Sequence, residues 1–236
     1  MKAEVAERMP VSKQKKAAAP TVNERIWREA VSWFWVILAF LLIEGTLVQA
    51  RVIPSGSMEN TVLIGDHLIV SRIGYDAGIP FTGWDVPLWR EPKRQQIIVF
   101  RAPLPDEGYP DFIKRVIGLP GDTLEIRQGV VYVNGKALAE PYRAAPPNPL
   151  ENRGPWQVPS GEYFMMGDNR ENSYDSRYWG FVPRGNIIGA PLIIYMSINA
   201  PEDVWNPGHL GERFGAYVDA VIHPGEVRWR RLFHTF

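Results

Sequence analysis

The residues of this chain with the clearest chemical potential lie in three polar clusters, each set within apolar sequence. The first is the run Ile53-Pro-Ser-Gly-Ser-Met58, in which Pro54 and Gly56 favour a tight turn. A tight turn exposes a serine hydroxyl, and a nucleophilic serine needs such exposure to reach a carbonyl carbon. Taken alone, however, the run fits an ordinary Pro-Ser-Gly loop better.

The second cluster is the pair Lys114-Arg115, which lies between Phe112-Ile113 and Val116-Ile117. Side chains alternate along a strand, so Lys114 and Arg115 point to opposite faces and one of them faces the buried side. Desolvation lowers the pKa of a lysine by up to about 3–5 units, and a neutral lysine amine can act as general base toward a serine. The alternative is a lysine that protects an edge strand from aggregation.

The third cluster runs from Gly167 to Arg177 and is rich in side chains that orient others through hydrogen bonds and ion pairs. A calcium loop is disfavoured, because Arg170 and Arg177 would lie among the ligands and the EF-hand spacing is not present. A solvated polar turn remains the alternative. No histidine context indicates a Ser-His-Asp triad, and the Gly-x-Ser-x-Gly elbow of α/β-hydrolases is absent around Ser57.

Composition narrows the class of protein that can carry these clusters. The 236 residues suffice for one domain with a sizeable core, and 26 basic residues balance 26 acidic ones. This balance gives no general attraction to nucleic acid. The chain has no cysteine, which excludes a disulfide scaffold, a Cys₄ zinc site and a thiol nucleophile.

One long apolar segment precedes the first cluster, and we expect residues 31–50 to form a transmembrane anchor. The segment approaches the roughly 17–25 residues that span a bilayer. Lysine and arginine outnumber the acids in residues 1–30, which predicts a cytoplasmic tail there and an exported body over 51–236. A cleaved signal peptide and a buried core helix are the alternatives, and self-cleavage at Val48-Gln49-Ala50 stays open.

The exported body should consist mainly of antiparallel β-strands. Short apolar runs separated by turn residues predict strands at 68–70, 96–100, 112–117, 123–126, 130–133, 163–166 and 187–196. Asn134-Gly135 is typical of a type I′ hairpin, across which the strand that follows Asp122 should pair. Residues 76–95, 141–160 and 199–222 are expected to form long loops.

Taken together and in this order, the clusters resemble the type I signal peptidases of bacteria, the leader peptidases. The matching pieces are Ile53–Met58 with Ile64-Gly-Asp66, Phe112–Asp122, and Gly167–Arg170 continuing through Asp175–Gly180. The preceding anchor matches as well, so the resemblance covers about residues 31–196. Val227-Arg-Trp-Arg looks like the closing strand of the family. One departure is Asn60, where the family usually has proline.

This resemblance implies a serine endopeptidase with a Ser-Lys dyad, in which Ser57 is the nucleophile and Lys114 the general base. It also implies that the Ser55 hydroxyl and the backbone N–H of Ser57 form the oxyanion hole. No metal or cofactor is expected.

The resemblance assigns supporting roles as well. Ser173 is expected to hydrogen-bond to Lys114 and orient it, while Asp175 and Arg177 form a structural ion pair with Arg115 nearby. The implied partners are preprotein signal peptides with small residues at positions −1 and −3, the lipid bilayer and the protein export machinery, with no nucleic acid.

The implied location is the bacterial inner membrane, with one span, a cytoplasmic N-terminus and the catalytic body on the outer side. Two other functions fit the same residues. One is a Ser-Lys maturation protease dedicated to a single exported substrate. The other is an inactive, membrane-anchored binding module that kept the fold.

Overall fold

The computed structural model describes residues 21–79, 84–103 and 111–236, in two compact units that meet at residue 40. Helix α1, Val22–Thr46, begins at a capping box in which Thr21 and Glu24 exchange backbone-to-side-chain hydrogen bonds of 2.7 and 3.3 Å. Its segment Val22–Glu44 is long and apolar enough to cross a membrane.

The helix boundaries differ from the expected segment 31–50. The capping box starts the helix earlier than the apolar run does, and the chain leaves helical geometry at Leu47. Residues Val48–Val52 form strand β1, which pairs with β2 along its whole length. Of the predicted cytoplasmic tail, residues 1–20 lie outside the described residues.

The body contains a large antiparallel sheet, as the alternating apolar runs predicted. Its seven strands follow the order β1 (Val48–Val52), β2 (Asp66–Ser71), β13 (Ile187–Ser197), β5 (Ile97–Arg101), β6 (Asp111–Gly118), β11 (Glu162–Met166) and β12 (Val182–Pro183). A second sheet has the order β10 (Arg153–Gln157), β7 (Thr123–Arg127), β8 (Val130–Val133) and β9 (Lys136–Ala137). All seven predicted strands are present, and the mainly-β fold class is confirmed.

The Asn134-Gly135 turn forms, but it joins β8 to β9 rather than β7 to β8. Strands β7 and β8 are joined by Gln128-Gly129, and both of these residues also have positive φ angles, of 48° and 76°. The expected pairing across Asn134-Gly135 was therefore wrong. The left-handed turn at Gln128-Gly129 joins β7 to β8 instead.

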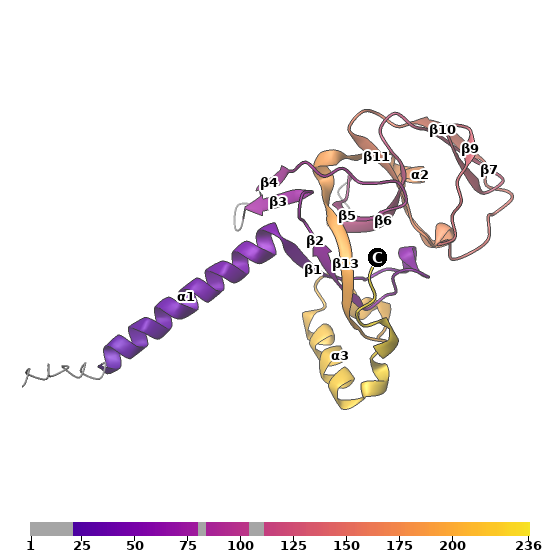
Figure 1. Cartoon of the computed structure of the whole chain (residues 1–236). Coiled ribbons are helices and arrows are strands. Elements are labelled where there is room, and N and C mark those ends of the chain that lie inside the picture. Colours follow the sequence, from indigo (N-terminus) through magenta and orange to yellow (C-terminus); the bar gives the residue numbers. More distant parts are fainter. Residues whose placement is uncertain (1–20, 80–83, 104–110) are drawn as a thin grey trace, which may run out of the picture. The chain divides into compact units, whose positions relative to one another are not determined.

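The three predicted loops contain regular structure. Residues 76–95 include the hairpin of β3 (Asp76–Ile79) and β4 (Trp84–Pro87), and residues 141–160 include β10. Helix α3, Leu210–Ile222, occupies much of 199–222 and packs Ala216, Tyr217 and Ala220 against Trp205 and Val52. Figure 1 shows α3 and the four-stranded sheet at different ends of the body.

The expected closing strand at Val227 is also absent from the described structure. Val227 makes only an isolated bridge with Ile198, and Trp229–Arg231 forms a 3₁₀ turn. Arg228 and Arg231 instead point toward the buried Asp66, and Arg231 Nη2 lies 2.6 Å from Asp66 Oδ2. Ion pairs with Asp66, and not strand pairing, therefore attach this C-terminal segment to the body.

Candidate active site

The nucleophile turn is held at both ends by the apolar core. Strand β1 leads into Ile53, whose backbone pairs with Asp66 and Gly65, and a single 3₁₀ turn, Gly56–Met58, follows the extended Ser55. The side chains of Ile53 and Met58 are buried in one cluster with residues of β2, β5 and β6. The turn between them therefore has a fixed position, and Ser57 lies in it with 6% exposure.

Lys114 reaches this serine from the middle of β6. Its Nζ lies 2.5 Å from Ser57 Oγ, and the lysine side chain is almost completely buried. Burial lowers the pKa of Lys114 from 10.5 to about 8, although the charges of Asp175 and Asp168 oppose this effect. About a tenth of the lysine is then neutral at pH 7, far more than for an ordinary lysine, and the neutral amine can accept a proton from the serine hydroxyl.

Arg115 points to the other face of β6, as strand alternation predicted. Its Nε and Nη2 donate to the two carboxylate oxygens of Asp168, at 2.8 and 2.6 Å. Its Nη1 donates to the carbonyl of Gln95 at 2.7 Å, and its guanidinium stacks on Tyr142 at 3.9 Å. Arg115 therefore stabilises the loop that carries Asp168 against β6, and it does not contact Ser57 in the described structure.

The cluster that begins at Gly167 packs directly on the nucleophile turn. Asn169 N donates to Ser57 O at 3.1 Å, and Asn169 Nδ2 donates to Gly56 O at 3.2 Å. A Cβ at Gly167 would lie 2.4 Å from Ser57 O and 2.3 Å from Ser173 Oγ. Glycine is required there because any side chain would displace the turn. Sequence reasoning assigned no role to Asn169 or Gly167, although both lie within the quoted motif.

Ser173, Asp175 and Arg177 form a buried network beside the lysine. Ser173 Oγ donates to Asp175 Oδ2 at 2.7 Å, and Arg177 Nε donates to Asp175 Oδ1 at 2.8 Å. The expected ion pair of Asp175 and Arg177 is present. The expected hydrogen bond between Ser173 and Lys114 is not among those of the described residues, and the partner to which the Ser173 hydroxyl donates is Asp175.

A cavity of about 190 Å³ opens beside the two reactive atoms. Its walls are formed by Pro54, Ser55, Ser57, Asp111, Phe112, Ile113, Lys114, Asn172 and Tyr174. Strand β11 pairs with β6 only from Arg115 onward, so no described strand covers the second edge of residues 111–114. Within the described residues, no group of three or more His, Asp or Glu side chains is placed to hold a metal ion.

The comparison with known proteins identifies the family. Residues 26–196 match the model described as signal peptidase, peptidase S26. The chain belongs to this family. It is therefore a serine endopeptidase of the signal peptidase type. The matched region covers the large sheet up to the next-to-last residue of β13 and ends before α3.

Two relatives show how far the similarity extends. The chain is 45% identical over 166 residues to a probable signal peptidase I-2 of Synechocystis sp., covering 69% of each protein. It is 39% identical over 198 residues to signal peptidase I of Leptolyngbya laminosa, covering 80% of this chain and 87% of that one. A crystal structure of a signal peptidase I from Enterococcus faecalis V583 matches at 36% identity and a TM-score of 0.38, covering 43% of this chain and 97% of that one.

Proposed function

We propose that this chain removes signal peptides from exported preproteins, with Ser57 as nucleophile and Lys114 as general base. The observation that carries the proposal is the 2.5 Å contact between Lys114 Nζ and Ser57 Oγ at the wall of an open cavity. The lowered pKa of Lys114 adds the chemical condition that a general base needs.

The reaction follows from this geometry. The neutral amine of Lys114 accepts the proton of Ser57 Oγ as that oxygen attacks the scissile carbonyl carbon. Two donors stabilise the negative charge that develops on the carbonyl oxygen: the hydroxyl of Ser55 and the backbone N–H of Ser57. The N–H of Ser57 has no acceptor within its single-turn helix. Lys114 then returns the proton to the leaving amine, and a water activated by the same amine hydrolyses the acyl-enzyme.

The substrate would bind as an extended strand. The uncovered edge of residues 111–114 offers backbone N–H and C=O groups to a peptide that passes Ser57. The proposal includes a preference for small residues at positions −1 and −3. Phe112 and Ile113 supply apolar wall, and this suits alanine-sized side chains.

The membrane setting is part of the proposal. The apolar segment Val22–Glu44 would hold the chain in the bacterial inner membrane, with residues before it in the cytoplasm and the catalytic body on the outer side. A preprotein that is still held by its own signal helix then lies in the same membrane, at the site to which the export machinery delivers it.

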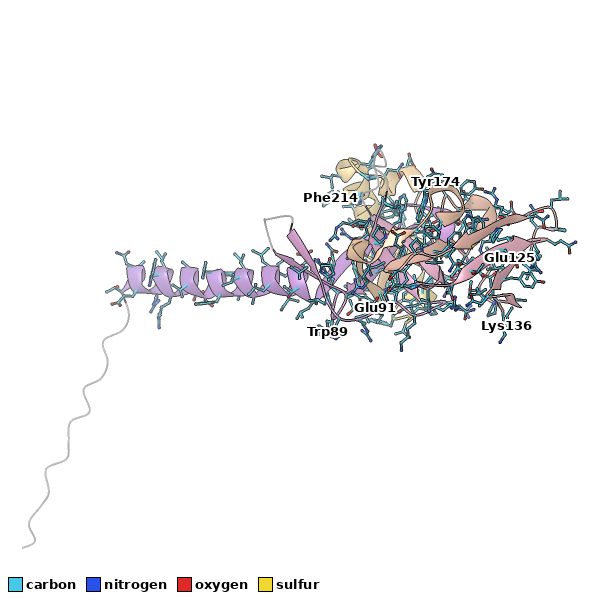
Figure 2. All side chains as sticks on the ribbon, turned by 90° about the horizontal axis from the view of Figure 1, so that it is seen from above. Trp89, Glu91, Glu125, Lys136, Tyr174 and Phe214 are labelled. Carbon is cyan, nitrogen blue, oxygen red and sulfur yellow. The ribbon has the colours of Figure 1, made fainter. Side chains whose placement is uncertain are left out.

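Replacement of the two reactive side chains tests the mechanism. Ser57→Ala and Lys114→Met should each abolish cleavage of a preprotein with an Ala-x-Ala site, while far-ultraviolet circular dichroism stays unchanged. The matched control is Lys136→Met. Lys136 is exposed on β9, at the same end of the body as Glu125 in Figure 2. Cleavage retained by either dyad variant would contradict the assignment.

The pH dependence gives a second test of the lysine base. The value of kcat/KM should rise with pH and level off above about pH 8, because the neutral form of Lys114 is the active one. Rates are measured on one peptide substrate between pH 6 and 10. A profile without a rise in this range would exclude a lysine base.

A further inference from the structure

An ion pair connects the two walls of the catalytic cavity. One wall is residues 54–57, which continue from β1, and the other is residues 111–114 of β6. Arg51 Nη2 lies 2.5 Å from Asp111 Oδ2, so a side chain near the end of β1 is ion-paired with the first residue of β6. Asp111 itself lines the cavity.

The contact joins strands that are not neighbours in the sheet. Strands β2, β13 and β5 lie between β1 and β6 in the strand order, so curvature of the sheet brings the two together. Side chains two residues apart share a face of a strand, which places Arg51 with Ile53 and Asp111 with Ile113. Ile53 and Ile113 belong to the same buried apolar cluster. The ion pair therefore continues that wall-to-wall contact toward the solvent.

The partial burial of this pair distinguishes it from a surface ion pair. The side chains of Arg51 and Asp111 are 35% and 16% exposed, against 60% and 26% for Arg127 and Glu125 on β7. A guanidinium and a carboxylate at this distance restrict each other more strongly than two apolar side chains do, because their attraction depends on orientation. The pair thus holds the two walls together at Asp111, which lines the cavity.

We propose that Arg51 and Asp111 are positioning residues that set the width of the substrate cleft and thereby limit the size of the substrate side chain it accepts. This inference rests on the proposed function, because it concerns the peptide that Ser57 cleaves. Neither residue takes part in the proton transfers. A wider cleft would still present Ser57 and Lys114 to a peptide, but it would accept larger side chains beside the scissile bond.

The test compares substrates rather than overall rates. Peptides with alanine or valine at position −1, or at position −3, are cleaved by the full-length chain in detergent, and kcat/KM is measured for each. Arg51→Met keeps much of the side-chain volume and removes the charge, and Asp111→Asn removes the opposite charge. In each variant the alanine-to-valine ratio should fall about tenfold at one of the two positions, while the rate on the alanine peptide changes much less.

Three further variants separate the effect of the Arg51–Asp111 ion pair from a general structural effect. The exchange Arg51→Asp with Asp111→Arg restores an ion pair and should restore most of the selectivity. Arg127→Met breaks the exposed pair on β7 and should leave the ratio unchanged. Because Arg51→Lys retains the charge at a partly exposed position, it provides a mild variant if Arg51→Met lowers the melting temperature.

The outcomes are distinct. A fall in kcat/KM that is equal for all of the peptides, or ratios unchanged in both Arg51→Met and Asp111→Asn, would overturn the proposal. If the wild-type chain cleaves none of the peptides, the proposed function fails instead. A lower alanine-to-valine ratio in the single variants that rises again in the exchange variant would support the proposal.

Discussion

Lys114 and Arg115 are neighbours in sequence, yet the two faces of β6 place them in opposite chemical settings. Both side chains are buried. Lys114 contacts the hydroxyl of Ser57, and none of the ion pairs formed by the described residues includes it. Arg115 has both oxygens of Asp168, a backbone carbonyl and the ring of Tyr142 around its guanidinium.

The difference shows that the partner, and not burial alone, decides what a buried cation does. Without a carboxylate in contact, desolvation lowers the pKa of Lys114 to about 8, and the residue becomes a base. With a bidentate carboxylate, Arg115 keeps its charge and becomes a structural support. The residue types match these settings, because a lysine can lose its proton in a protein and an arginine cannot.

The largest expected effect comes from giving the Lys114 position the chemistry of Arg115. Lys114→Arg retains a long basic side chain that cannot act as a base at any usable pH. Cleavage should fall by about 10²–10⁴, the usual contribution of a general base. Peptide assays at pH 7 and pH 9 measure the loss, and both should show it. Activity that returns at pH 9 would mean that another group supplies the base.

The next effect comes from removing the partner on the other face. Asp168→Asn leaves Arg115 buried beside a neutral amide, and loss of one member of a buried pair costs about 3–5 kcal/mol. Chemical denaturation in detergent measures the free energy of unfolding. Glu125→Gln, which breaks an exposed pair on β7, is the control and should change it by less than about 1 kcal/mol. Equal effects in the two variants would contradict the structural role of Asp168.

The two faces of β6 were predictable from sequence, but their partners were not. Alternation alone places Lys114 and Arg115 on opposite sides, and the apolar neighbours indicate that one side is buried. Asp168 lies 53 positions from Arg115, and local patterning cannot identify a partner at that separation. The resemblance assigned Ser173 to Lys114, whereas in the fold the Ser173 hydroxyl donates to Asp175, only two residues away.

Strand β1 and helix α3 are among the elements that escaped prediction, because local preference and tertiary contact disagree there. Strand β1 looks like the end of the apolar segment, and only its pairing with β2 makes it a strand. Helix α3 contains Gly211 and Gly215, which weaken helix propensity by about 1 kcal/mol each. Its packing against Trp205 and the hydrogen bond between His67 Nε2 and Tyr217 Oη, at 2.9 Å, compensate for that weakness.

The third effect is a pH dependence of the free energy of unfolding that arises from the burial of Lys114. Its pKa is about 8 in the folded chain and 10.5 in the unfolded chain, so the unfolded state binds more protons between these values and stability rises with pH. Burial of the charged lysine therefore destabilises the folded chain by about 3 kcal/mol, and this loss of stability is present in full below about pH 8. Lys114→Met should therefore stabilise the chain more at pH 7 than at pH 10. Lys136→Met, the exposed control, should show no such dependence, and an equal gain at both values would contradict the lowered pKa.

The smallest effect distinguishes the two possible partners of Ser173. Its hydroxyl donates to Asp175, so Ser173→Ala should cost about 1 kcal/mol of stability and reduce kcat/KM only several-fold. Without the Ser173 hydroxyl, the carboxylate of Asp175 should attract the Lys114 ammonium more strongly and move the midpoint of the pH profile upward. Ser176→Ala removes a buried hydroxyl that accepts from Met165 N and should leave the midpoint in place. A loss above about 100-fold at an unchanged midpoint would instead mean that Ser173 orients Lys114 directly once a peptide is bound.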